Sequence, residues 1–436
     1  MRTLQLREYE ALDESLEPGE VTALLGLERR PVELAPTGVP GNYTLRAGCH
    51  VGTVVLPTLR LLIRPKVPLD NLFFLLGYAS GRARWGNGRF PYAKEADLLE
   101  AVGWLFQDEV NQAARRGFPR AYRLQQEPLQ TIRGRIAFSE QIRLRQGLAL
   151  PLECRYEEYT EDTELNRILK AAHRRLLQLP VLDATLSLRL RRTLAHFSSA
   201  GDVSYPPGAV PSLALDRLSR HWEPALRLAE LILRQEVVRD QQGETMGTTF
   251  LVNMNELFES FVTRVVDEEA AERGWLLEPQ ASRRLTERVW MRPDLVLRRL
   301  GADCAVGDVK YKELEIEGFR HADLYQLLAY CTALGLDQGL LIYAGEGASK
   351  VQVVQRAGIA LEQVRVDLSG AREEVLANAR WAAGRLVEQA ESASADWARR
   401  AGRGSSFPSH PGGHVSSPTG SGRSVAACLN CNMPRQ

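Results

Sequence analysis

The sequence lacks the features that mark membrane and secreted proteins. None of its apolar runs approaches the roughly 18 residues that a membrane-spanning helix needs, and its N-terminal segment is too polar and too acidic for a signal peptide. Its six cysteines show no disulfide framework. Cys428 and Cys431 form a CxxC, but the second ligand pair of a structural zinc site is missing. We therefore expect a cytoplasmic globular protein without membrane contact.

Lysine is also scarce, because only six lysines stand among 55 basic residues. Lysine is a compact point charge that can release its proton, and arginine is neither. Two of the six, Lys310 and Lys312, lie in the stretch VGDVKYKE at 306–313, which we therefore single out. The dipeptide Gly-Lys is absent, so the chain has no P-loop. Any nucleotide hydrolysis must then come from another chain.

The net charge of +1 favours no class of partner, but the charge is unevenly distributed. Residues 113–155 contain nine arginines against three glutamates. Such an excess would suit a phosphate backbone, and an ordinary solvated face explains it equally well. Both interpretations stay open.

Composition and periodicity divide the chain into four segments, which together predict a multidomain protein of the α+β and α/β classes. Residues 1–72 are β-rich, with short apolar pieces between glycines and prolines. Residues 73–245 are mainly helical, with a β insertion near 122–138. Residues 246–398 show the order α-β-β-β-α-β of a layered domain. The remaining residues, 399–436, are rich in Gly, Ser and Pro and are expected to be a disordered tail.

The middle segment contains a clear helix and a candidate linker. An apolar stripe predicts a helix that Pro180 ends, and its members are Leu165, Ile168, Leu169, Ala172, Leu176 and Leu179. The polar run at 239–249 is the best candidate for a linker before the last domain.

The stretch VGDVKYKE reads as a strand that carries a possible catalytic pair. Asp308 and Lys310 stand two positions apart, so both project to one face while Val309 points to the other. Asp294, after Pro293, opens another apolar β run, and antiparallel pairing would bring the two carboxylates together. Close carboxylates are costly unless a cation separates them. Taken alone, Asp308 and Lys310 are equally well explained as a surface ion pair.

Oxygen-only sites of this kind suit Mg²⁺. Such an ion would generate a nucleophilic hydroxide and stabilise a phosphodiester during in-line attack. Lys310 would position or deprotonate the water and neutralise the charged phosphate.

Two flanking helices carry further candidates. Glu256 and Glu259 share one flank of their helix, and either could complete the metal shell. Gln326 and Tyr330, four residues apart, also share a face. Each has an ordinary explanation: solvated glutamates, a surface amide and a core aromatic. In the order helix, Pro-Asp strand, Asp-x-Lys strand and Gln-x-x-x-Tyr helix, they favour a site.

This arrangement resembles that of the PD-(D/E)xK nucleases, here as Pro293-Asp294, Asp308-x-Lys310 and Gln326-x-x-x-Tyr330. Longer segments are similar to the McrC subunit of McrBC-type restriction systems, over roughly residues 40–370. They are VGTVVLPTLRLLIRPKVPLDNLFFLLGYA, RGRIAF, CRYEEYTEDTELNRILKAA, NMNELFESFV, RPDLVLRR, DVKYKE and DLYQLLAY.

The resemblance implies a restriction-endonuclease-like α/β/α domain at 246–398 and the function of a DNA endonuclease subunit. The implied cofactor is Mg²⁺, and the implied partners are DNA with modified cytosine and an AAA+ GTPase ring of the McrB type, whose hydrolysis such proteins stimulate. Contact with the ring is implied for the N-terminal region, 1–72. The implied site residues are the metal ligands Asp294, Asp308 and Glu259 (Glu256 in reserve), the catalytic Lys310, and Gln326 and Tyr330.

Two other functions remain open from the sequence. One is a self-sufficient nuclease that acts on DNA or RNA without a motor. The other is a non-catalytic adaptor that only activates the ring, although an intact set of Asp294, Asp308 and Lys310 argues against it.

Overall fold

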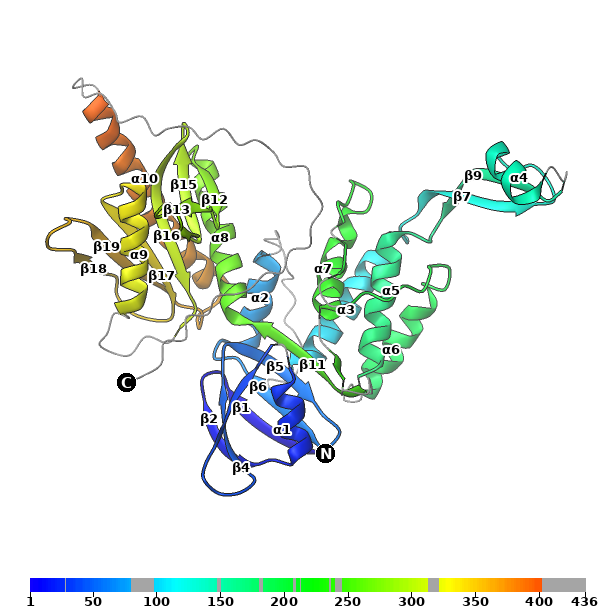
Figure 1. Ribbon diagram of the computed structural model, residues 1–436, viewed down its shortest axis with the longest axis horizontal. Coiled ribbons are helices and arrows are strands. Elements are labelled where there is room, and N and C mark those ends of the chain that lie inside the picture. Colours follow the sequence, from blue (N-terminus) through cyan, green and yellow to red (C-terminus); the bar gives the residue numbers. More distant parts are fainter. Residues whose placement is uncertain are drawn as a thin grey trace. The chain divides into compact units, whose positions relative to one another are not determined.

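The computed structural model describes residues 1–27, 29–79, 98–146, 150–179, 183–206, 209–211, 213–234, 237–239, 245–312 and 321–401. Within these ranges the chain has a mixed α+β architecture with five sheets and ten α-helices (Figure 1). None of the described helices has the length and hydropathy to cross a membrane. The CxxC of Cys428 and Cys431 and the predicted tail beyond residue 401 lie outside the described residues.

The N-terminal region contains two sheets and one short helix. The larger sheet has the order β1-β6-β5-β11-β10, with bounds Arg2–Arg7, Leu59–Arg64, His50–Val55, Thr245–Asn253 and Val237–Arg239. The smaller has the order β2-β4-β3, with bounds Ala11–Ser15, Asn42–Ala47 and Val32–Pro36. Helix α1 (Pro18–Leu25) was not expected in this β-rich region. Its start is set by Pro18 in the first turn and by a capping box between Glu17 and Glu20.

The predicted linker at 239–249 was wrong, because its described part forms strands. Strand β11 pairs antiparallel with β5, so residues far apart in sequence complete one sheet. Gly52 on β5 allows this approach: its φ is +134°, and a Cβ there would lie 2.0 Å from the carbonyl oxygen of Phe250. The N-terminal sheet therefore uses residues beyond the expected boundary at 246.

The middle region is helical, as expected. Its helices are α2 (Leu69–Ala79), α3 (Leu98–Ala114), α5 (Glu164–Leu177), α6 (Ala184–Ala195) and α7 (Glu223–Leu233), the last preceded by a 3₁₀ turn at Arg220–Trp222. On α5 the predicted stripe from Leu165 to Leu176 is buried. Trp222 is fully buried in the same core, where its ring lies near Phe118 and Phe197.

An arm of strands β7 (Ala121–Leu129), β8 (Arg135–Ile136) and β9 (Leu152–Thr160) with helix α4 (Phe138–Arg145) interrupts the helices. The predicted β insertion near 122–138 corresponds to β7 and β8. The arm carries eight exposed large apolar side chains: Tyr122, Leu124, Ile132, Phe138, Ile142, Leu144, Leu150 and Tyr159.

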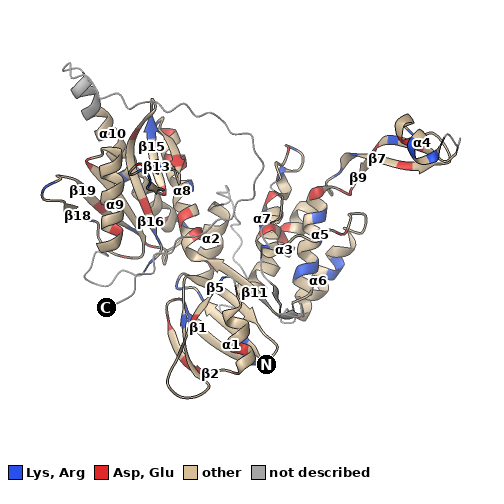
Figure 2. Ribbon diagram, viewed as in Figure 1, with Lys and Arg blue, Asp and Glu red and all other residues tan. Residues whose placement is uncertain are grey.

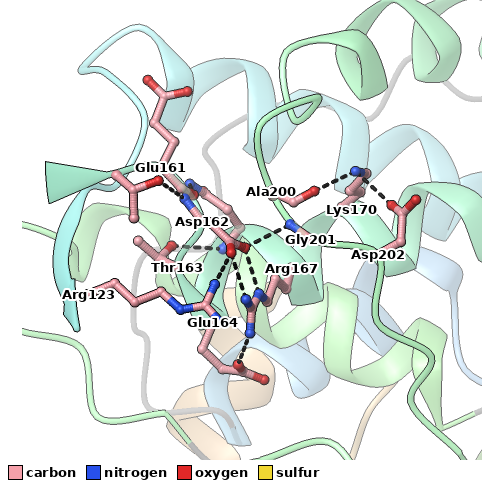
Figure 3. Close-up of polar contacts among 12 residues, drawn as sticks. Arg123, Glu161, Asp162, Thr163, Glu164, Arg167, Lys170, Ala200, Gly201 and Asp202 are labelled. Atoms are coloured by element: carbon pink, nitrogen blue, oxygen red, sulfur yellow. Dashed lines mark hydrogen bonds and ion pairs between the residues drawn. The ribbon is translucent and has the colours of Figure 1, made fainter. Parts of the chain in front are cut away.

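A charged cluster fixes the base of this arm to the helices (Figure 3). The carboxylate of Asp162 accepts hydrogen bonds from Arg167 at 2.6 and 2.7 Å and from the backbone N–H of Gly201 at 2.7 Å, and it pairs with Arg123 of β7. The bond from Arg167 lowers the pKa of Asp162 to about 2. Nearby, Lys170 donates to the carbonyl of Ala200 at 2.6 Å. One carboxylate therefore ties together β7, the start of α5 and the loop at 201.

The C-terminal region is a six-stranded sheet with helices on both faces. The strand order is β12-β15-β16-β17-β19-β18, with bounds Leu276–Pro279, Leu295–Arg299, Ala302–Lys310, Gln338–Ala344, Ala360–Val366 and Lys350–Val353. The helices are α8 (Met254–Glu272), α9 (His321–Leu334) and α10 (Arg372–Ala401), and a small hairpin, β13 (Arg283–Arg284) and β14 (Trp290–Met291), lies between β12 and β15. The predicted order α-β-β-β-α-β is confirmed, with this hairpin added.

Alternate residues of the strands face opposite layers. Val309 and Ile342 belong to the core formed with α8 and α10, while Val306 and Leu341 belong to the core formed with α9. Asp308 and Lys310 have the parity of Val306, so they lie on the α9 face, and Val309 points to the other face as expected.

Candidate active site

The two aspartates come together at the end of a strand pair. Strands β15 and β16 pair antiparallel with Leu295 opposite Gly307, so Asp294 and Asp308 are the next positions on the same ladder. The carboxylate of Asp294 accepts a hydrogen bond from the backbone N–H of Val309 at 2.8 Å. The expected antiparallel pairing of the two strands is confirmed, and the charge of Asp308 acts on the pKa of Asp294, as it would between neighbouring carboxylates.

Asp308 is buried with little hydrogen-bond support. Its residue is 1% exposed, and neither carboxylate oxygen has a hydrogen-bond partner of regular geometry within the described structure. Its one close polar contact there is ionic: the Nζ of Lys310 lies 2.6 Å from Oδ2. A buried carboxylate that lacks donors is costly unless a cation faces it. Asp308 therefore has free coordinating capacity.

The charge of each group changes the proton affinity of its neighbours. Burial is the main cause that raises the pKa of Asp294 to about 8, and the nearby charge of Asp308 is the second. Burial is the largest single effect on Lys310 and lowers its pKa, but the charge and hydrogen bond of Asp308, together with the charges of Asp294 and Asp323, outweigh it and raise that pKa. At neutral pH and without a metal ion, the ammonium group of Lys310 thus faces Asp308, and Asp294 retains its proton.

Glu259 faces this site and Glu256 does not. The charge of Glu259 contributes to the raised pKa of Asp294, and its carboxylate accepts a hydrogen bond from the side chain of Gln280. Glu256 accepts a hydrogen bond from Asn253 at 3.0 Å and acts electrostatically on His50 instead. A hollow of about 450 Å³ adjoins Glu259. Of the two candidates, Glu259 is the one placed near the aspartates.

Gln326 and Tyr330 also meet at the site. The side-chain amide of Gln326 donates to the hydroxyl of Tyr330 at 2.6 Å, and this hydroxyl makes a longer contact of 3.5 Å with the carbonyl of Arg292. Burial raises the pKa of Tyr330, with added effects from Asp308 and Asp294. Both residues thus adjoin the segment that carries Pro293 and Asp294.

The sequence reasoning gave no role in the site to three residues of this region: Gln280, Asp323 and Lys312. Gln280 donates its backbone N–H to the carbonyl of Asp294 at 3.0 Å and holds Glu259 with its side chain. Asp323, 3% exposed in the first turn of α9, pairs with Lys312 at 3.0 Å. The position of Lys312, two residues after Lys310, was the available signal, whereas the contacts of Gln280 and Asp323 depend on the fold.

The donor set of the site fits a hard cation in part. Asp294 and Asp308 offer carboxylate oxygens of the kind that Mg²⁺ prefers, and the Oδ1 of Asp308 has no hydrogen-bond partner among the described residues. Among the described residues, however, no group of three or more His, Cys, Asp or Glu side chains is arranged to hold a metal ion. The carboxylates of Asp294 and Asp308 therefore belong to one site, while the carboxylate of Glu259 is bound by the side chain of Gln280.

Comparison with known proteins adds three findings. The family described as "McrBC 5-methylcytosine restriction system component" matches residues 45–344. A protein of Escherichia coli (strain K12), described as type IV methyl-directed restriction enzyme EcoKMcrBC, is 23% identical over 310 residues, which cover 64% of this chain and 86% of that protein.

A solved structure has a similar fold. It is a refined half-complex from a tetradecameric assembly of Thermococcus gammatolerans McrB AAA+ hexamers with bound McrC. The match has a TM-score of 0.59 at 19% identity and covers 88% of this chain and 100% of the matched chain. Because the family match spans more than half of the sequence, the chain belongs to the McrBC 5-methylcytosine restriction system component family.

Proposed function

We propose that this protein is the endonuclease subunit of a modification-dependent restriction system and hydrolyses DNA phosphodiesters with Mg²⁺. One observation carries the proposal: the half-buried Asp294 and the buried Asp308 occupy facing positions on paired strands, and Lys310 stands 2.6 Å from Asp308. Membership of the McrBC family supports DNA as the substrate. The three-layered C-terminal region with Pro293-Asp294 and Asp308-x-Lys310 is then a PD-(D/E)xK domain of restriction-endonuclease-like type.

The residues take distinct roles in this proposal. Asp294 and Asp308 would hold the cation, and Glu259, whose carboxylate accepts a hydrogen bond from Gln280, would be a third carboxylate for it. Bound Mg²⁺ supplies the Lewis acidity that activates water and stabilises charge on the phosphate. Lys310 remains an ammonium because its pKa is raised, so it neutralises charge on the attacked phosphate rather than removing a proton. The contacts of Gln326 and Tyr330 position the segment that carries Asp294.

We further propose that the protein works with an AAA+ GTPase ring of the McrB type. The support is the fold similarity to a chain from an assembly of McrB hexamers with bound McrC. Large exposed apolar side chains gather on the arm at 121–160, whereas among the described residues of 1–72 only Met1, Leu25 and Val39 are of that kind. Exposed apolar patches mark interaction sites, so the arm is a better candidate for the ring contact than the N-terminal region.

Plasmid cleavage with Mg²⁺ tests this function. The wild-type chain would be assayed on cytosine-methylated and unmethylated DNA, with and without the ring protein encoded nearby and GTP. We expect cleavage that requires methylation, the ring protein and GTP together. Cleavage by the chain alone would point to a self-sufficient nuclease. An adaptor would raise the GTP hydrolysis of the ring without ever cutting DNA.

A further inference from the structure

The hairpin of β13 and β14 is connected at both ends to residues of the candidate active site. Its first arm follows Gln280, which contacts both Asp294 and Glu259, and its second arm leads through Arg292 into Pro293 and Asp294. Arg283 pairs with Met291 and Arg284 with Trp290. Backbone bonds from Leu285 and Thr286 to the carbonyl of Val289 close a tight turn at its tip.

The inner face of this hairpin is anchored to the domain. Met291 is 7% exposed and belongs to the core beneath α9, as does Ala281 at the start of the first arm. Arg283 bonds to Asp303 of β16 at 2.8 Å and to Glu278 of β12 at 2.7 Å. Hydrogen bonds to these two acids raise the pKa of Arg283, so the anchoring charge is permanent. The hairpin is therefore held in a defined position beside the aspartates.

The outer face carries arginines and an aromatic ring that nothing described covers. Trp290 is 59% exposed, and the guanidinium carbon of Arg284 lies 5.2 Å from the centre of its ring. Arg284, Arg288 and Arg292 are all exposed, and no described acid lies within ion-pair distance of them. Leu285 and Val289 at the tip are also exposed, 39% and 47%. Exposed guanidinium groups around a bare indole suit an anionic ligand with flat or apolar parts.

Most arginines in the other arginine-rich part of the chain, residues 113–155, are paired with carboxylates, unlike the outer arginines of the hairpin. Five of the nine arginines between 113 and 155 are paired with carboxylates, and positive and negative segments alternate along the arm (Figure 2). The pairs are Arg120 with Glu161, Arg123 with Asp162, Arg133 with Glu158, Arg145 with Glu153 and Arg155 with Glu140. Much of that positive charge is already neutralised, so the hairpin is the better site for a polyanion.

We propose that the hairpin at 281–292 is a DNA-contact element that holds the duplex beside the scissile phosphate. Arg284 and Arg288 bind phosphate oxygens of the backbone, and Trp290 packs against the sugars or bases of the adjoining groove. Each arm is about four residues long, or about 13 Å, which corresponds to about four nucleotides of one strand. The proposal rests on the nuclease function proposed above, since it places the duplex where Asp294 and Asp308 would cut it.

Binding of the full chain to a short duplex in EDTA tests the hairpin separately from cleavage. Affinity would be measured by fluorescence anisotropy over a range of salt concentrations, for wild type, Arg284→Ala/Arg288→Ala and Trp290→Ala. The matched control is Arg191→Ala/Arg192→Ala, which removes the same charge from exposed positions of α6. Thermal unfolding would confirm that each variant is folded.

The expected results differ between the two kinds of substitution. Losing two phosphate contacts should weaken binding roughly tenfold or more at low salt and lower the slope of log affinity against log salt by about 2. Trp290→Ala should weaken binding with the slope unchanged, because no charge is lost. The control double variant should keep wild-type affinity and slope.

The proposal is overturned if the hairpin variants bind like wild type, if the control loses as much as they do, or if the wild type does not bind even at low salt. Hairpin variants that keep DNA binding but no longer bind the ring protein would assign the surface to a protein partner instead. If the hairpin is needed for binding but the wild type never cuts, the contact element stands and the nuclease function fails. If the wild type cuts and the hairpin variants bind DNA like wild type, the nuclease function stands and the contact element fails.

Discussion

Replacing Asp294 with asparagine should stabilise the protein, because the wild-type carboxyl lies in an unfavourable position. Burial and the charge of Asp308 raise its pKa from 3.8 to about 8. Asparagine has the same shape, and its side-chain oxygen can still accept the hydrogen bond from Val309 that Asp294 accepts at 2.8 Å. The variant thus removes the charge conflict while the packing stays close to wild type.

The size of the effect follows from the pKa difference between the two states. A carboxyl whose pKa is raised on folding makes the folded state progressively less stable as pH rises from about 4 to about 8, since the unfolded chain releases its proton first. Each pH unit in that window corresponds to about 1.4 kcal/mol. About 4 kcal/mol therefore accumulates between pH 4 and pH 7, and above about pH 8 the penalty is constant. The advantage of Asp294→Asn over wild type should grow with this slope.

Urea unfolding without divalent cations, at several values between about pH 5 and about pH 8, measures this difference. Mg²⁺ should then stabilise the wild type more than the variant, because the asparagine no longer offers a negative ligand. A variant that is less stable than wild type at about pH 8, or whose advantage does not grow with pH, would refute the charge conflict.

Asp162→Asn is the matched control, because the same substitution should act with the opposite sign. The pKa of Asp162 is lowered to about 2 by its bond from Arg167. A lowered pKa gives stability that is present above about pH 4 and lost as pH falls through about 2. The asparagine variant should therefore cost about 2 kcal/mol, with no change between about pH 5 and about pH 8.

Three further results are expected from the same geometry. Lys310→Arg should cut about a hundredfold or more slowly, as poorly as Lys310→Ala, because the larger guanidinium does not fit the half-buried place 2.6 Å from Asp308; single-turnover cleavage rates near wild type in the arginine variant would contradict this. Tyr311→Phe should cost about 1–3 kcal/mol in urea unfolding, because its hydroxyl donates to the buried Glu8 at 2.7 Å; an unchanged midpoint would show that this bond contributes nothing. As pH falls below about 8, the Mg²⁺ concentration for half-maximal cleavage should rise by up to about tenfold for each pH unit, since the metal ion must displace one proton from Asp294. A Mg²⁺ requirement that does not change with pH would count against Asp294 as a ligand.

The local parts of the site could be predicted from the sequence. Strand periodicity alone placed Asp308 and Lys310 on one face and Val309 on the other, and the structure agrees. The apolar stripe of α5 likewise predicted which side chains are buried. These features depend on neighbours a few residues away, so a short window contains the information.

The features that the sequence did not reveal depend on distant contacts. Residues 239–249 look polar enough for a linker, yet 245–249 belong to strand β11, whose close pairing with β5 is allowed by Gly52. The role of Asp323 depends on Lys312 and Tyr343 from other elements. The choice of Glu259 over Glu256 was made from the family resemblance, and it is Gln280 and Asp294 that show which of the two faces the site.

Cleavage by Asp308→Asn, compared with wild type, tests the central claim most directly. Asp202→Asn serves as the control, because Asp202 is exposed in the middle region, where it pairs with Lys170 and Arg174 away from the two aspartates and the hairpin. Methylated plasmid, Mg²⁺, the ring protein and GTP would be present in every reaction, and the GTP hydrolysis of the ring would be followed in parallel. We expect wild type and Asp202→Asn to cut, and Asp308→Asn to leave the plasmid intact while GTP hydrolysis continues. Cleavage by Asp308→Asn at the wild-type rate would show that the phosphodiester is cut elsewhere.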